Sequence, residues 1–446
     1  MRVIGAVLVA LGIAVASCAP VPKVVAPPPS PARVVLAPAQ PGPWRIRKTE
    51  WTQADEAGFG ELVRQIAVSG CTTTAACMRS AANFYHDSDP PTLSFHADCA
   101  KWVYMLRAYY ASKNGLPFSY VSRISGTGDD LRFSKTSNAP IERSDLVDTG
   151  MGLDAVAILQ RMHDQVYSAT YRMDPALQAP WMQDFYSPKI QPGSIHAGTA
   201  IYDITGHVMV VYDVTADGSI LYMDAHPDES VTRGNFGAHI PKSPFWLGGG
   251  FKNFRPLKLV GAQLRPDGIY VGGHVVLAAN SAIADFSLEQ YRGNVADTGV
   301  DSNRFQYNNT SLDLYEYARA VMSKGGFAYN PVYETQVMMR SICSDARDGS
   351  RVAAARARSN LAALHADISQ AVALWKQRDM RVVYHGTSLK KTLAATYADE
   401  EQACVVADGS PATSPIDRIT RAADVKLLIA RIDDSAPFSQ MRPVGY

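Results

Sequence analysis

The sequence predicts an α+β fold: a helix packed on a small antiparallel sheet, followed by a mostly α-helical C-terminal domain. The helix is expected in the segment CAKWVYMLRAYYASKNG, where Asp98 is a good N-cap, Cys99 begins the helix and Gly115 ends it. Three runs that alternate apolar and polar residues are expected to form the sheet: 195–202, 207–214 and 220–223. A change to helical spacing near residue 285 marks the boundary between the two parts.

Other segments follow the same two patterns. Helical spacing is expected between about residues 50 and 85 and again over 153–167. Further strand-like runs cover 255–264 and 269–277. Beyond the boundary three helices are expected: 311–323, 331–345 and 353–379. Residues 122–192 are rich in polar, proline and aromatic residues, and we interpret them as an insertion beside or over the site rather than as a domain.

The composition limits the classes of function. Lysine and arginine together number 43, and aspartate and glutamate 42, so no surplus of positive charge points to nucleic acid as a partner. We detect no internal repeat and no glycine loop of the phosphate-binding kind. The 446 residues are enough for two ordinary domains with their own cores, which we place at 46–285 and 286–446.

Residues 1–17 have the layout of a bacterial export signal. Arg2 gives a short positive segment, and Val3–Val15 is almost wholly apolar but too short to cross a bilayer. The segment that ends in Cys18 resembles the lipobox of bacterial lipoproteins, which implies cleavage before Cys18 and a diacylglyceryl group on its sulfur. An ordinary signal peptide cut nearby is the alternative. Ala19 follows the anchor, and by analogy with enteric lipoproteins this implies the outer membrane, facing the periplasm.

Residues 18–45 are expected to form a tether. After the lipidated Cys18 the chain is mostly Pro, Ala and Val with almost no charge. Such a composition buries no core and favours extended polyproline geometry. We therefore expect this segment to hold the folded part away from the membrane to which the lipid anchors it.

Cysteine counting selects one thiol. With Cys18 set aside as the anchor, five cysteines remain, which is an odd number. Exported proteins usually pair their cysteines, and one left over is a candidate reactive thiol. Two disulfides are the expected pairing: Cys71 with Cys77, and Cys343 with Cys404. This pairing would leave Cys99 as the thiol, although spacing alone leaves the other pairings open.

Cys99 and the strand region supply three groups that complement one another chemically. A thiol at a helix N-terminus lies at the positive end of the helix dipole, which favours the thiolate. His207 begins a predicted strand and could take the thiol proton, and Asp224 on the next strand could orient the imidazole. His226 lies two residues further on and on the same side of that strand, so it remains the alternative orienter.

Two stretches resemble the NlpC-type and CHAP cell-wall peptidases and amidases, which share the papain-like superfold. The first is DCAKWV, which is similar to the Asp-Cys pair that begins their catalytic helix. The second runs from QPGS at residue 191 through GHVMVVYDVTADGSILYMDAH, which is similar to their turn and their Gly-His-Val strand. Ala100 and Ser194 depart from the usual residues. The segment between Cys99 and His207 is also longer than in those families, and the insertion would account for its length.

The resemblance implies a cysteine hydrolase of the bacterial cell envelope that cleaves a peptide or amide bond, with peptidoglycan stem peptides as the expected substrate. Cys99 would attack the carbonyl carbon, His207 would pass the thiol proton to the leaving amine, and Asp224 would hold the imidazole. No metal or organic cofactor is expected.

Two other functions remain open from the sequence. A transglutaminase-like relative has the same order of Cys, His and Asp and would transfer the acyl group to an amine. A non-catalytic envelope lipoprotein could instead use the papain-like domain as a binding or scaffold module, with residues 286–446 docking a protein partner. The chemistry of Cys99 distinguishes these functions, because a catalytic thiol is accessible and acidic whereas a structural thiol is buried or oxidised.

Overall fold

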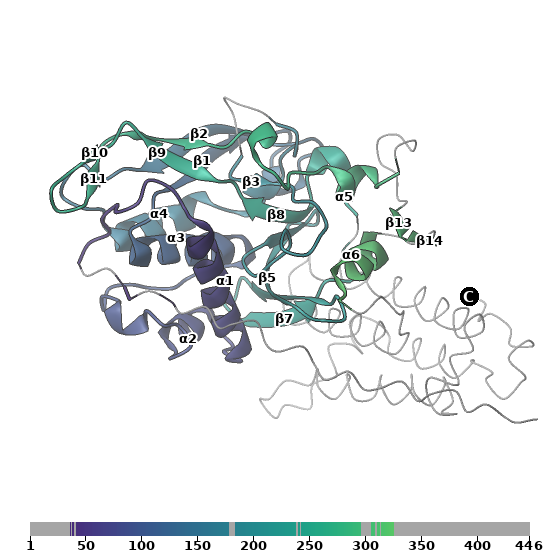
Figure 1. The fold of residues 1–446 in the computed structure, drawn as a ribbon, viewed down its shortest axis with the longest axis horizontal. Coiled ribbons are helices and arrows are strands. Elements are labelled where there is room, and N and C mark those ends of the chain that lie inside the picture. The colour runs from purple at the N-terminus through teal and green to yellow at the C-terminus, as the bar shows by residue number, and fades with distance from the viewer. Residues whose placement is uncertain are drawn as a thin grey trace, which may run out of the picture. The chain divides into compact units, whose positions relative to one another are not determined.

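The computed structural model describes residues 36, 38–39, 42–177, 183–237, 240, 242–295, 305–307, 310–312 and 314–324. It combines helices and strands (Figure 1), which confirms the α+β class. The export signal, most of the tether and the C-terminal helices expected after residue 324 lie outside the described residues, as do Cys18, Cys343 and Cys404. Among the helices that the structure describes, none has the length and apolar character needed to cross a membrane.

A six-stranded antiparallel sheet forms the centre of the described part. Its strand order is β3-β8-β4-β5-β6-β7. The bounds are β3 (Phe185–Tyr186), β4 (Ala200–Asp203), β5 (His207–Val214), β6 (Ile220–Ala225), β7 (Val231–Asn235) and β8 (Gly250–Phe254). The structure confirms the strands predicted over 207–214 and 220–223, and the strand predicted over 195–202 is shorter, at Ala200–Asp203. The strands β3, β7 and β8 were not predicted.

The helix that carries the thiol is α3 (Cys99–Asn114), and the structure confirms both of its predicted ends. The Asp98 side chain accepts a hydrogen bond from the backbone N–H of Lys101, and Gly115 ends the helix in the left-handed conformation, with φ of 63°. Trp102 and Val208 belong to one hydrophobic core that the helix shares with the sheet. Because both are fully buried, this packing fixes the position of the helix N-terminus against β5.

Two further helices precede α3: α1 (Gln53–Val68) and α2 (Thr74–Arg79). Arg107 of α3 ties α1 to the thiol helix. Its guanidinium lies 3.4 Å from the centre of the Trp51 ring and donates two hydrogen bonds to Glu56, at 2.6 and 2.7 Å. A planar guanidinium suits both contacts at once, so this residue orients the helix that carries Cys99.

The predicted insertion contains regular structure that its composition did not indicate. A hairpin of β1 (Phe118–Ser125) and β2 (Ala139–Leu146) runs through the segment expected to be irregular. Its register shifts after Val121 and after Arg123, so the two strands do not alternate cleanly in sequence. The helix predicted over 153–167 is confirmed as α4 (Ala155–Gln165).

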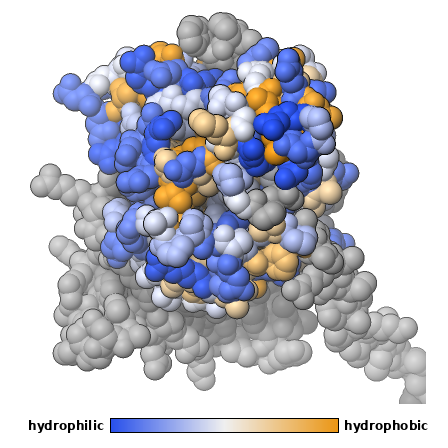
Figure 2. Space-filling model, turned by 90° about the vertical axis from the view of Figure 1, so that its left-hand side faces the viewer, coloured by the Kyte–Doolittle hydropathy of each residue, from blue (hydrophilic) through white to orange (hydrophobic). Residues whose placement is uncertain are grey.

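The remaining elements are short. The two predicted runs after residue 255 form two small hairpins: β9 (Leu257–Val260) with β12 (His274–Leu277), and β10 (Gln263–Leu264) with β11 (Tyr270–Val271). Single turns of 3-10 helix occur at η1 (His86–Ser88), η2 (Leu131–Phe133), η3 (Ser168–Tyr171), η4 (Phe245–Leu247) and η5 (Asn280–Ala282). Figure 2 shows that hydrophobic side chains are scattered in small groups among hydrophilic ones on one face.

The second face of the main sheet has its own hydrophobic core. Ile201 and Met209 of the sheet pack with Leu314 and Ala318 of α6 (Leu314–Met322). The other elements described in this part are α5 (Glu289–Arg292), β13 (Phe305–Tyr307) and β14 (Thr310–Leu312). The sheet therefore lies between α3 on one face and α6 on the other.

Candidate active site

Cys99 occupies the first helical position of α3 and is half-buried. It is present as a thiol, whereas Cys71 and Cys77 form the predicted disulfide. The Sγ atom lies 3.9 Å from the carbonyl oxygen of Gly206, the residue before His207. The thiol is therefore placed at the N-terminal end of β5, where His207 begins the strand.

A helix N-terminus and a guanidinium lie near the thiol, together with the carboxylates of Asp98 and Asp130. The first-turn N–H groups of a helix point out of its N-terminus and favour a negative charge there. Arg132 of η2 adds a guanidinium. Its pKa is raised, first by its hydrogen-bonded pair with Asp130 and more weakly by the negative charges of Asp98 and Cys99. A positive helix end and a nearby cation are features that can stabilise a negatively charged sulfur.

The turn before β5 brings His207 into place. Gly206 has a φ of 99° and donates its N–H to Asp203 at 2.9 Å, and the positive φ suits a glycine. The strand then begins at once with His207, whose Nε2 donates to Oδ2 of Asp224 at 2.6 Å. His207 is only 7 % exposed and Asp224 only 2 %. A buried, charge-assisted hydrogen bond of this length holds an imidazole in one orientation.

Both carboxylate oxygens of Asp224 accept a hydrogen bond. Thr232, its cross-strand partner on β7, donates its hydroxyl to Oδ1 at 2.7 Å. Burial alone would raise the pKa of the Asp224 carboxyl. The charge of His226, the hydrogen bond and charge of His207 and the hydrogen bond from Thr232 together outweigh burial and hold the pKa well below its usual range. Asp224 is therefore ionised at neutral pH and accepts both hydrogen bonds as a carboxylate.

His226, the alternative orienter, takes a different position. Its ring stacks on that of His207 with centroids 5.6 Å apart, and its Nε2 lies 3.5 Å from Oδ2 of Asp224. The same Nε2 is 2.8 Å from the hydroxyl oxygen of Thr232. Because the Thr232 proton goes to Asp224, the hydroxyl oxygen accepts from His226. Of the two candidate orienters, Asp224 makes the hydrogen bond to His207. His226 lies near the same carboxylate and donates to Thr232, which in turn donates to Asp224.

The side chains of His207, Asp224 and His226 could also act as a set of metal ligands. One ligand atom each of His207, Asp224 and His226 lies within 4.8 Å of the others. Two tetrahedral ligands at about 2.0–2.1 Å from a zinc ion are roughly 3.3 Å apart. The 2.6 Å between His207 and Asp224 is shorter and is the length of a hydrogen bond. A metal would have to separate this pair, so the geometry fits a shared proton better than a shared ion.

Sequence reasoning missed three contributors to this arrangement. Thr232 lies on a strand that the sequence did not indicate, so no pairing with Asp224 could be foreseen. Arg132 lies in the segment interpreted as an insertion. Glu229 follows His226 in a tight turn with a positive φ of 65°, which is uncommon for a residue other than glycine. Its carboxylate contacts Nδ1 of His96 at 2.5 Å, and this pair connects the turn to the segment that leads into Cys99.

The arrangement can support nucleophilic chemistry. A half-buried thiol at a helix N-terminus lies beside the strand that begins with a buried, hydrogen-bonded histidine and carboxylate. These are the residue types that activate a sulfur nucleophile. Comparison with known proteins adds no assignment: no protein-family model, curated protein or solved structure matches this chain.

Proposed function

We propose that this chain is a cysteine hydrolase of the papain-like class that cleaves a peptide or amide bond through Cys99, His207 and Asp224. One observation carries the proposal: the 2.6 Å contact between His207 and Asp224 occurs at the start of the strand that the Cys99 sulfur approaches. The resemblance of DCAKWV and GHV to NlpC-type and CHAP enzymes adds the bond type and the expected substrate, peptidoglycan stem peptides in the bacterial envelope.

The proposed steps use the two nitrogens of His207 differently. Nε2 is engaged with Asp224, so Nδ1 takes the proton from the Cys99 thiol. The thiolate attacks the carbonyl carbon, and the oxyanion is stabilised by the first-turn N–H groups of α3. His207 then donates its proton to the leaving amine, which departs as the C–N bond breaks. Water attacks the thioester with His207 as the base, and the acid product leaves with the thiol restored.

The predicted lipoprotein signal and the predicted tether support a location of this activity in the bacterial cell envelope. A lipid on Cys18 would anchor the chain to a membrane, and the Pro/Ala-rich segment would let the catalytic part reach the cell wall. In the alternative, non-catalytic function, residues 286–446 would dock a protein partner. An acyl acceptor other than water would turn the same chemistry into transamidation.

The test is hydrolysis of defined peptidoglycan fragments by the full chain, followed by mass spectrometry of the products. We expect new amine and carboxylate termini from the wild-type protein and none from Cys99→Ala. Mass increments of an added amine in place of water would indicate transamidation. Equal cleavage by wild type and Cys99→Ala would contradict the proposal. A chain that binds these fragments without cleaving them would indicate a binding module.

A further inference from the structure

The Cys71–Cys77 disulfide closes a small loop beside the edge of the main sheet. β7 is the last strand in the order of that sheet, and an edge strand has a partner on one side only unless another segment covers it. Residues 72–74 of the loop pair antiparallel with residues 229–231 through two backbone hydrogen bonds, of 2.8 and 3.0 Å. The crosslinked loop therefore covers the outer side of β7 where that strand begins.

Arg233 of β7 makes a second connection to the same loop. Its guanidinium donates to the carbonyl oxygen of Ala67 at 2.5 Å and to that of Cys71 at 2.8 Å. Its Nη2 also lies 3.3 Å from the sulfur of Cys71. A guanidinium presents its donors in a fixed planar arrangement, so Arg233 holds β7 in one position against the end of α1 and the disulfide.

This connection reaches the proposed active site through the neighbouring residue, Thr232. Adjacent side chains of a strand point to opposite faces of the sheet. Arg233 contacts the disulfide loop on one face, and Thr232 donates to Oδ1 of Asp224 at 2.7 Å on the other. The loop therefore fixes the strand whose hydroxyl group holds Asp224, the carboxylate that is hydrogen-bonded to His207.

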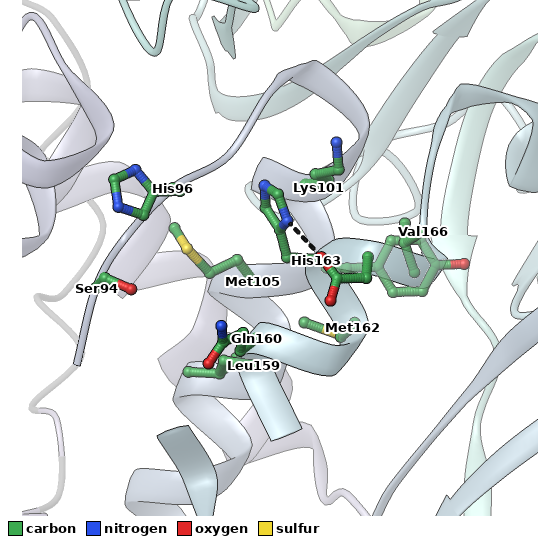
Figure 3. A pocket seen from close by; sticks show the side chains of 11 residues that line it. Ser94, His96, Lys101, Met105, Leu159, Gln160, Met162, His163 and Val166 are labelled. Atoms are coloured by element: carbon green, nitrogen blue, oxygen red, sulfur yellow. Dashed lines mark hydrogen bonds and ion pairs between the residues drawn. The ribbon is translucent and has the colours of Figure 1, made fainter. Parts of the chain in front are cut away.

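The turn before β7 depends on the same loop. Glu229 has a positive φ of 65°, a conformation that a residue other than glycine keeps when its surroundings hold it. Its carbonyl oxygen accepts from the N–H of Thr74, and its carboxylate contacts Nδ1 of His96. The buried hydroxyl of Thr74 donates to the carbonyl oxygen of Phe95 at 2.7 Å. Figure 3 shows His96 on the segment that runs into α3, so the loop contacts both the turn and this segment.

We propose that the Cys71–Cys77 disulfide and Arg233 position the active site, so that hydrolysis reaches its full rate only in the oxidised protein. The inference rests on the proposed function for the reaction that is controlled. A dithiol reductant would attack the half-buried sulfur of Cys71 and break the S–S bond. Its two hydrogen atoms would pass to Cys71 and Cys77 as the reductant itself became a disulfide. Because cytosolic cysteines stay reduced and exported ones become oxidised, the full rate would be reached after export.

Steady-state hydrolysis by the full chain without reductant tests the inference. Cys71→Ser/Cys77→Ser should lower kcat about tenfold with little change in KM, which is the size of effect expected for one positioning hydrogen bond. The control is Cys343→Ser/Cys404→Ser, which removes the other predicted disulfide and should leave kcat unchanged. Adding Thr232→Val to Cys71→Ser/Cys77→Ser should cause no further loss, because both changes act on the same contact to the carboxylate.

Two arginines provide a matched pair of variants that keep the disulfide. Arg233→Met retains the length of the side chain but removes its donors, and it should lower kcat by about tenfold. Arg79 is the exposed last residue of α2, and Arg79→Met should leave kcat unchanged. Equal effects of the two changes would remove Arg233 from the positioning role.

Hydrogen exchange in the Cys99→Ala protein tests the same connection without any chemistry. Adding Cys71→Ser/Cys77→Ser should accelerate exchange in residues 229–235 about tenfold more than in β8, which lies near the other edge of the sheet. Equal acceleration in both strands would show that the disulfide has no specific hold on β7.

The outcomes separate this inference from the proposed function. Equal kcat for wild type and Cys71→Ser/Cys77→Ser, or losses that add to that of Thr232→Val, would overturn the positioning role and leave Cys99-dependent cleavage intact. Conversely, a wild-type protein in which the disulfide protects β7 but which cleaves nothing would contradict the proposed hydrolysis alone.

Discussion

The Nε2 atom of His207 and the Oδ2 atom of Asp224 are 2.6 Å apart across the neighbouring strands β5 and β6. Both residues are almost fully buried, and the sulfur of Cys99 approaches the residue before His207. An imidazole fixed in this way can exchange its proton at Nδ1 only.

Asp224→Asn should lower kcat by about 10²–10⁴-fold with little change in KM, because the amide no longer holds the imidazole in the required tautomer. The measurement is steady-state hydrolysis of the peptide that the wild type cleaves. Asp213→Asn on β5 is the control, since Asp213 accepts a local hydrogen bond from Val214 and lies outside the proposed site. Equal rates for wild type and Asp224→Asn would remove Asp224 from the mechanism.

Thr232→Val should reduce kcat less, by about tenfold. The variant keeps the shape of the side chain but removes the donor to Oδ1 of Asp224 and the acceptor for His226. Because a positioning residue acts through Asp224, the pH profile of kcat/KM should shift as well. Double-mutant analysis with Asp224→Asn checks this: the Thr232 change should have no further effect once Asp224 is altered. Additive losses would place Thr232 outside this network.

Acid should remove a contribution of Asp224 to stability. Its folded-state pKa lies below the unfolded value, which is about 3.9. The contribution is therefore complete above about pH 5, and it is lost as the pH falls below 3.9 towards the folded-state pKa. Urea unfolding of wild type and Asp224→Asn should show a free-energy difference that shrinks as the pH falls below about 4. A difference that grows as the pH falls below about 4 would show that the sign is wrong.

Reduction of the Cys71–Cys77 disulfide should lower the free energy of unfolding by about 2 kcal/mol. The bond closes a loop with a sequence separation of 6, and chain entropy predicts a loss of roughly this size for so short a loop. Unfolding of a Cys99→Ala/Cys343→Ser/Cys404→Ser protein with and without reductant checks it, since that background removes the thiol of Cys99 and the second disulfide that the sequence predicts. A Cys71→Ser/Cys77→Ser variant should match the reduced protein, and no difference between the two states would contradict the estimate.

Local signals made α3 predictable to the residue. Asp98 and Gly115 cap it, and their effects depend on neighbours within one turn. The pair β1 and β2 was not predictable, because register shifts interrupt its alternation. The sequence also left the choice between Asp224 and His226 open, since both lie on the same face of the strand. The hydrogen bond from His207 to Asp224 across the neighbouring strands β5 and β6, which is a long-range property, separates their roles.

The most direct test of the central claim is the rate of alkylation of Cys99 by iodoacetamide from pH 4 to 10 in the folded, non-reduced protein. Peptide mapping assigns the label, and His207→Ala is the compared variant. A thiol activated by His207 should label with an apparent pKa well below the usual value of about 8.5, and this pKa should rise towards 8.5 in His207→Ala. The same profile for both proteins, or a Cys99 that does not react, would contradict the account.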